Sequence, residues 1–202
     1  MSRSQRRSSK RIHPRKLQGK PMRESFLIFC EGPTEVGYFS SFRKKAKPVS
    51  GGNALAVVQN AIAYKNASDR RYDQYWVVFD KDDTIEQHFE EAIRLAIKND
   101  IRPAWSNQAF ELWFILHYRD FRHACHRNQY EAVLRQYIPT YSANDKGEDQ
   151  GRALYQCTIQ RVQSAIDNAL NGFESFESDG SPAQKESCTK VYELINSIRQ
   201  NL

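Results

Sequence analysis

The sequence of 202 residues has little of what marks membrane and secreted proteins. No apolar run approaches the ~20 residues that a membrane-spanning helix needs. The basic N-terminus lacks the apolar segment and the cleavage site of a secretory signal. The four cysteines are widely spaced and form no C-x-x-C pair, which argues against a redox or zinc motif. We therefore expect a reduced, cytoplasmic protein that does not enter a membrane.

Several catalytic motifs are also missing. There is no Walker A or G-x-G-x-x-G phosphate loop, so Gly51-Gly52 is interpreted as a turn. No Ser-His-Asp triad or Cys-His pair stands out, which disfavours hydrolysis through a covalent nucleophile. The histidines and the cysteine between His117 and His126 match no familiar zinc spacing. The remaining candidates for chemistry are carboxylates.

Acidic residues are absent from residues 1–23, which hold nine of the 30 Lys and Arg residues. The rest of the chain carries 21 basic and 24 acidic residues, so the basicity belongs to this segment. Such a segment cannot bury enough apolar surface to fold alone, and we predict a disordered arm over residues 1–24. It either contacts nucleic-acid phosphates or is a solvated tail. The candidate contacts are Arg3, Arg6, Arg7, Lys10, Arg11, Arg15 and Lys16.

Two apolar segments end in acids. The segment 26–30 (FLIFC) predicts a buried strand, which is followed by Glu31, a Gly-Pro turn and a helix over 34–45 that carries Glu35. The segment 75–79 (YWVVF) predicts a second strand, which runs into Asp80 and Asp82. Ligands of parallel sheets bind outside the carboxyl ends of the strands, so these acids are expected to share a site.

Strands and helices alternate along the first 120 residues. Helices are predicted at 54–64, at 84–98 with Thr84 as its cap, and at 109–118, with a further strand at 101–105. This alternation predicts an α/β fold with a parallel sheet flanked by helices. From about residue 128 the chain is expected to be helical, at 130–138, 152–173 and 185–200. The polar segment 140–150 between these helices could close over a site.

The acid-ending strands carry a family resemblance. EGPTE after a hydrophobic strand, followed by a strand ending in D-x-D, resembles the Toprim signature of topoisomerase, primase and OLD-type nuclease domains. Together with the later block SNQAFELWFILHY, the chain from about Phe26 resembles the RloB-like family. The resemblance implies a Toprim-like core over 25–120 and a helical C-terminal extension over 121–202 that packs on it.

Clustered carboxylates raise one another's pKa unless a cation compensates them, and oxygen-only ligand sets select Mg²⁺ or Mn²⁺. Glu111 belongs to the block of the resemblance and is either a metal partner or a capping carboxylate. The predicted metal ligands are Glu31, Glu35, Asp80, Asp82, Asp83 and Glu111. Of these, Glu31, Asp80 and Asp82 are predicted to be catalytic. Lys81, Asn107 and His117 are candidate substrate contacts, although a buried core role for His117 is the simpler interpretation.

The first functional hypothesis is a Mg²⁺-dependent nuclease that cleaves DNA or RNA with metal-activated water. The resemblance further implies phage defence or abortive infection with an RloA-type ATPase partner, and a homo-oligomer is a further hypothesis. The alternative is a non-catalytic nucleic-acid-binding adaptor that uses the basic arm. A primase-type nucleotidyl transferase has less support, because no nucleotide-binding element is visible.

Overall fold

The computed structural model describes residues 23–49, 52–175 and 180–202. Apart from its last two residues, the predicted basic arm lies outside this part of the chain, as does Gly51. The strands β1 (Phe26–Cys30), β2 (Lys45–Pro48), β3 (Gln74–Asp80) and β4 (Arg102–Ser106) form one sheet in the order β2-β1-β3-β4. Every pairing is parallel, which confirms the predicted α/β class.

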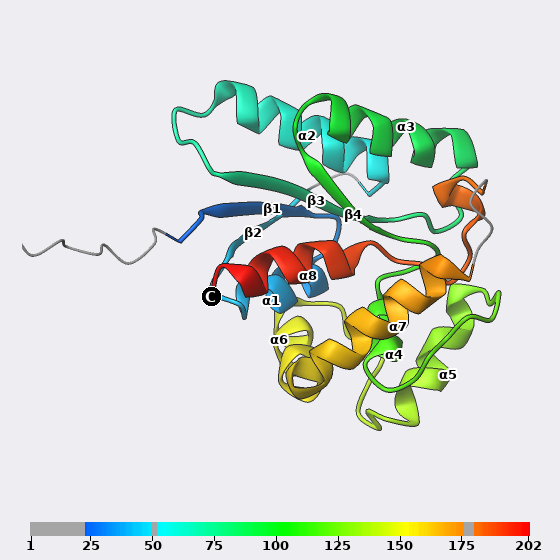
Figure 1. The fold of residues 1–202 in the computed structure, drawn as a ribbon. Coiled ribbons are helices and arrows are strands. Elements are labelled where there is room, and N and C mark those ends of the chain that lie inside the picture. The colour runs from blue at the N-terminus through cyan, green and yellow to red at the C-terminus, as the bar shows by residue number, and fades with distance from the viewer. Residues whose placement is uncertain (1–22, 50–51, 176–179) are drawn as a thin grey trace, which may run out of the picture.

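Helices cover both faces of the sheet (Figure 1). On one face, α2 (Ala54–Ala67) and α3 (Glu86–Lys98) pack on side chains such as Leu27 and Val77. On the other, α1 (Pro33–Ser40) and α4 (Glu111–Leu116) pack on the alternate side chains, such as Ile28. A strand that is buried on both faces must be apolar throughout. The continuous apolar segments therefore form the two central strands.

The C-terminal part adds α5 (Tyr130–Arg135), α6 (Glu148–Thr158), α7 (Val162–Glu174) and α8 (Val191–Gln200), with single 3₁₀ turns at Arg127–Gln129, Ile159–Arg161 and Pro182–Gln184. The prediction of one helix over 152–173 was wrong, because the 3₁₀ turn at Ile159–Arg161 separates α6 from α7. No helix in the described ranges is long and apolar enough to cross a membrane.

The helix predicted over 185–200 begins only at Val191. The preceding residues complete the edge of β4 instead: the Asn107 N–H donates to the Cys188 carbonyl at 2.8 Å, and the Lys190 N–H donates to the Trp105 carbonyl at 2.7 Å. Buried backbone groups at a sheet edge need partners, and this extended segment supplies them. The helix start was therefore decided by tertiary pairing.

Two boundaries in the first half were also wrong. The helix expected over 34–45 ends at Ser40, and the chain reverses at Arg43, whose φ is 59°, before entering β2. β2 is polar because edge strands tolerate charged residues and proline. The helix expected from Thr84 begins at Glu86, after an Ile85 cap that makes no side-chain hydrogen bond, so Thr84 is not its cap.

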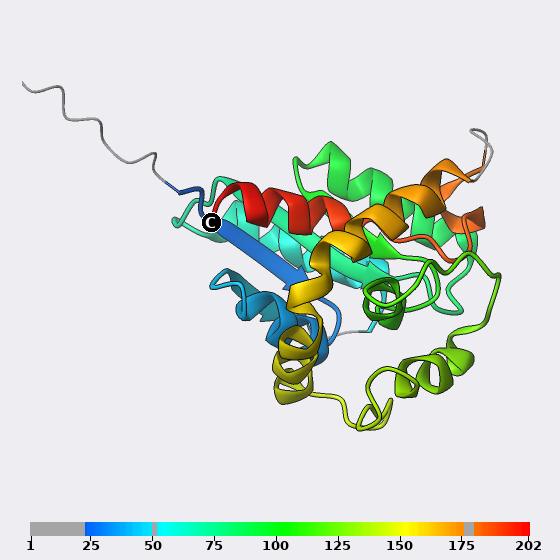
Figure 2. The ribbon, with the colours of Figure 1, turned by 60° about the horizontal axis from the view of Figure 1, so that its bottom comes forward.

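Two glycines hold α6 against α1. A Cβ atom at Gly37 would lie 2.0 Å from the Glu148 carbonyl oxygen, and one at Gly151 would lie 2.0 Å from the Thr34 carbonyl oxygen. The two backbones therefore touch, and α6 lies beside α1 in Figures 1 and 2. This contact places the segment before α6 near the carboxyl end of β1.

Candidate active site

A cavity of about 620 Å³ lies at the carboxyl ends of β1 and β3. One part of its lining is acidic and comes mainly from the sheet edge, α1 and α4. The acidic lining residues are Glu31, Glu35, Asp80, Asp82, Glu111 and Glu131. The other part comes from residues 126–150 and carries donors and cations. These residues are His126, Arg127, Asn128, Tyr130, Tyr141, Lys146 and Gln150.

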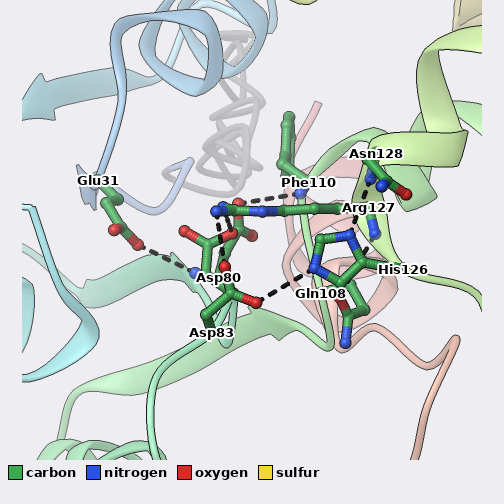
Figure 3. Close-up of polar contacts among 9 residues, drawn as sticks. Glu31, Asp80, Asp83, Gln108, Phe110, His126, Arg127 and Asn128 are labelled. Carbon is green, nitrogen blue, oxygen red and sulfur yellow. Dashed lines mark hydrogen bonds and ion pairs between the residues drawn. The ribbon is translucent and has the colours of Figure 1, made fainter.

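The register of the central strands brings Glu31 to Asp80. Cys30 pairs with Val78, so Glu31, which follows β1, lies beside the end of β3, where Asp80 is the last residue. The Asp80 N–H donates to Glu31 Oε2 at 3.1 Å, and the Phe110 N–H donates to Asp80 Oδ2 at 3.0 Å (Figure 3). Asp80 Oδ1 is buried and accepts no hydrogen bond within the described residues. Asp80 is therefore held firmly, with one carboxylate oxygen left for another ligand.

Glu35 lies one helical turn after Glu31 and is 7% exposed. Gly32 makes room for it, because a Cβ atom there would lie 2.6 Å from Glu35 Oε2. Burial, and then the nearby charges of Glu111 and Glu31, raise the pKa of Glu35 to about 7. This carboxyl group can therefore exchange a proton near neutral pH.

Asp82 has a left-handed backbone conformation, which is uncommon for a residue other than glycine. It has a φ of 46° and its N–H donates to the carbonyl of Gln108, whose φ is 75°, at 3.0 Å. Left-handed backbone conformations of non-glycine residues gather at functional sites. The side chain of Asp82 forms an ion pair with Arg127. Asp80 and Asp82 line the same cavity, although the positive φ of Asp82 takes it out of the extended conformation of β3.

The cavity lining holds more acidic side chains than Lys and Arg side chains. Burial raises the pKa of Asp80 well above its usual range, and the charges of Glu35, Asp82, Glu31 and Glu111 add to this effect. No three acidic, His or Cys side chains converge as metal ligands in the part of the chain that the structure describes. Several of the carboxylates instead have separate protein donors: Glu111 Oε1, for example, accepts from Tyr141 Oη at 2.8 Å.

The donor set nevertheless fits a hard divalent cation. All the acidic lining atoms are oxygens, which Mg²⁺ and Mn²⁺ prefer. The unpartnered Asp80 Oδ1 supplies one buried ligand atom, and Glu31 and Asp82 flank it at the same sheet edge. Asp80 is buried among other acids that raise its pKa, and a bound cation would favour its ionised form.

The sequence matches the family described as "RloB-like protein" over residues 26–198. The chain belongs to the RloB-like family. The match spans the sheet, the cavity and the C-terminal helices, so the acids and the segment facing them lie within the shared region. No curated protein and no solved structure matches the chain.

One acid and one base predicted for the site of this RloB-like chain, Asp83 and Lys81, do not line the cavity. Asp83 has a side chain that is 67% exposed, and it pairs with His126 at 3.2 Å and with Arg127 at 3.0 Å. Lys81 donates its backbone N–H to the Ser106 carbonyl at 2.9 Å, and its side chain is not part of the lining.

Asn107 and His117 are buried away from the cavity lining. The Asn107 side chain donates to the carbonyls of Pro182 at 3.1 Å and Ala183 at 3.0 Å, which ties the segment before α8 to the sheet. His117 Nδ1 lies 2.8 Å from the Trp113 carbonyl oxygen, and burial lowers the pKa of His117 to about 4. His117 thus has the position of a neutral core histidine.

Sequence reasoning missed the basic part of the lining. Arg127, Tyr130, Tyr141 and Lys146 were not predicted as site residues, and His126 was considered only as a zinc ligand. No spacing rule connects these residues to strands more than 40 positions earlier. The prediction that 140–150 faces a site was the one available signal, and Tyr141 and Lys146 lie in that segment.

Proposed function

We propose that this RloB-like protein is a nuclease that depends on Mg²⁺ or Mn²⁺ and hydrolyses phosphodiester bonds of DNA or RNA. The observation that carries the proposal is the buried, unpartnered Asp80 Oδ1 in a carboxylate-lined cavity at the ends of two adjacent parallel strands. Acid-ending strands in this order also support a Toprim-like assignment of the sheet.

Glu31, Asp80 and Asp82 are the proposed cation ligands. A divalent cation supplies positive charge that polarises a phosphoryl oxygen and acidifies water. Glu35, with a pKa raised to about 7, is suited to accept a proton from the attacking water near neutral pH. Burial, and then the charge of Glu111, keep the pKa of Glu35 raised, and Tyr141 donates a hydrogen bond to Glu111. Lys146, in the opposite lining, adds positive charge for an anionic substrate.

The biological role follows from the family resemblance. We propose a function in phage defence or abortive infection, in the cytoplasm, with an RloA-type ATPase as partner. The chain has no Walker A motif, so nucleotide hydrolysis has to come from such a partner. The alternative is a nucleic-acid-binding adaptor, which is supported by the basic residues 1–23 and by the lack of converging metal ligands among the described residues.

The test compares the wild type with a double variant, Asp80→Asn with Asp82→Asn, which removes two charges at nearly constant shape. Asparagine tolerates the positive φ of position 82, so the fold should persist. We expect calorimetry to show Mn²⁺ binding to the wild type only, and cleavage of labelled RNA or DNA to disappear in the variant. Cleavage retained by the double variant contradicts the proposed site, and Mn²⁺ binding without cleavage, with the ATPase added, favours the adaptor.

A further inference from the structure

The acids of the D-x-D loop are already in contact with a cation of the protein itself. Arg127 lies in the 3₁₀ turn Arg127–Gln129, and its guanidinium pairs with Asp82. It also pairs with Asp83 at 3.0 Å (Figure 3). His126 lies 3.2 Å from the other oxygen of Asp83. The C-terminal part of the chain thus places an arginine where the proposed function needs a divalent cation.

The ion pair between Arg127 and Asp82 is partly exposed to solvent, so a bound cation can displace Arg127 at low cost. The side chains of Arg127 and Asp82 are 39% and 33% exposed, and pairs of this exposure contribute little net stability. The two partners also differ in freedom. Asp82 is fixed by its backbone bond to Gln108, whereas an arginine side chain can change rotamer at low cost. Arg127 can therefore leave while Asp82 stays.

A second feature of the same lining points to an anionic ligand. Tyr130 is 1% exposed, lines the cavity, and its hydroxyl has no hydrogen-bond partner among the described residues. Burial raises the pKa of Tyr130, so the hydroxyl stays protonated and can donate. A buried donor without an acceptor costs free energy unless a ligand supplies one. A free donor in a cavity lining that also contains Arg127 suits a phosphate oxygen.

We propose that Arg127 neutralises Asp82 until a divalent cation takes over that carboxylate, and that Arg127 then binds, together with Tyr130, a phosphate oxygen of the nucleic acid. This exchange rests on the proposed function and adds the substrate-binding residues to it. The positive charge at Asp82 is replaced when Arg127 leaves, and the phosphate gains a bidentate partner that a lysine could not match.

The experiment uses the full chain in four forms: wild type, Arg127→Gln, Tyr130→Phe and Arg122→Gln. Arg122 is the matched control, because it is an arginine of the same segment that pairs with Asp120 and does not line the cavity. Free Mn²⁺ is measured by its electron paramagnetic resonance signal without nucleic acid. Binding of labelled RNA and DNA oligonucleotides is then measured by fluorescence anisotropy with Ca²⁺ present.

We expect Arg127→Gln to bind Mn²⁺ about three- to tenfold more tightly, because the competing cation is gone. The same variant should bind oligonucleotide about tenfold more weakly. Tyr130→Phe should leave Mn²⁺ affinity unchanged and weaken oligonucleotide binding about three- to tenfold. Arg122→Gln should change neither measurement.

Unchanged or weaker Mn²⁺ binding by Arg127→Gln overturns the exchange, and unchanged oligonucleotide binding by both cavity variants overturns the phosphate role. If the wild type binds Mn²⁺ through Asp80 and Asp82 and cleaves nucleic acid, either of these outcomes contradicts only the exchange and leaves the proposed function standing. If neither the wild type nor Arg127→Gln binds Mn²⁺, the proposed function fails with it.

Discussion

At the scale of single residues, burial raises the pKa of the carboxyl groups in the cavity and lowers the pKa of a core histidine. Asp80 and Glu35 share a cavity with other acids, so burial and like charges both favour their protonated forms. His117 is buried at the end of α4 with its ring against that of Trp113, and it is not in the cavity lining. Burial outweighs the hydrogen bonds to the Trp113 and Phe114 backbone, so the pKa of His117 is lowered and the neutral ring is favoured.

The neutral His117 predicts a stability loss in acid. Its folded-state pKa of about 4 lies below the ordinary value of 6.5, so the unfolded chain binds the proton first and stability falls as pH drops below about 6.5. Between pH 7 and pH 5 this costs about 2 kcal/mol. Urea unfolding of the wild type and His117→Asn measures it, because asparagine retains a donor for the Trp113 carbonyl. The variant should lose about 2 kcal/mol less over this range, and parallel pH curves would contradict the assignment.

At the scale of elements, the position of α6 depends on the absence of two side chains. Gly37 and Gly151 allow the backbones of α1 and α6 to touch, and α1 carries Glu35. The same contact places residues 141–150, with Tyr141 and Lys146, over the cavity. The helix pair thus connects the acidic and basic parts of the lining.

Gly151→Ala should therefore affect both stability and activity. Its Cβ atom would lie 2.0 Å from the Thr34 carbonyl oxygen, so α6 has to move away from α1, at a cost of roughly 1–3 kcal/mol. Gly147→Ala is the matched control, because a Cβ atom there meets nothing within 4 Å and the φ of 179° suits any residue. Thermal unfolding and the nuclease assay check this, and equal behaviour of the two variants would show that the close contact is not needed.

At the scale of the whole molecule, charge is divided between the arm and the rest of the chain. The arm makes the chain basic, whereas the cavity is lined by six carboxylates and by His126, Arg127 and Lys146. In the proposed function, the basic residues of the arm attract nucleic-acid phosphates through their charge.

Deleting residues 1–22 should weaken oligonucleotide binding mainly at low salt, because each phosphate contact by Lys or Arg releases counterions. The slope of log K against log salt should become shallower by several units. A full-length variant with the arm's Lys and Arg replaced by Gln separates charge from length and should behave like the deletion. If the slope stays the same, the arm is a solvated tail.

The sequence alone determined the local features of this protein. Continuous apolar segments identified β1 and β3, since strands buried on both faces must be apolar, and the acids that follow them identified one part of the cavity. Helix ends, β2 and the start of α8 were decided by tertiary contacts, because an edge strand has no apolar pattern and the residues before α8 pair with β4. The basic part of the cavity also needed the tertiary structure. Arg127 meets Asp82 across 45 positions of sequence only because the C-terminal segment folds back over the sheet edge.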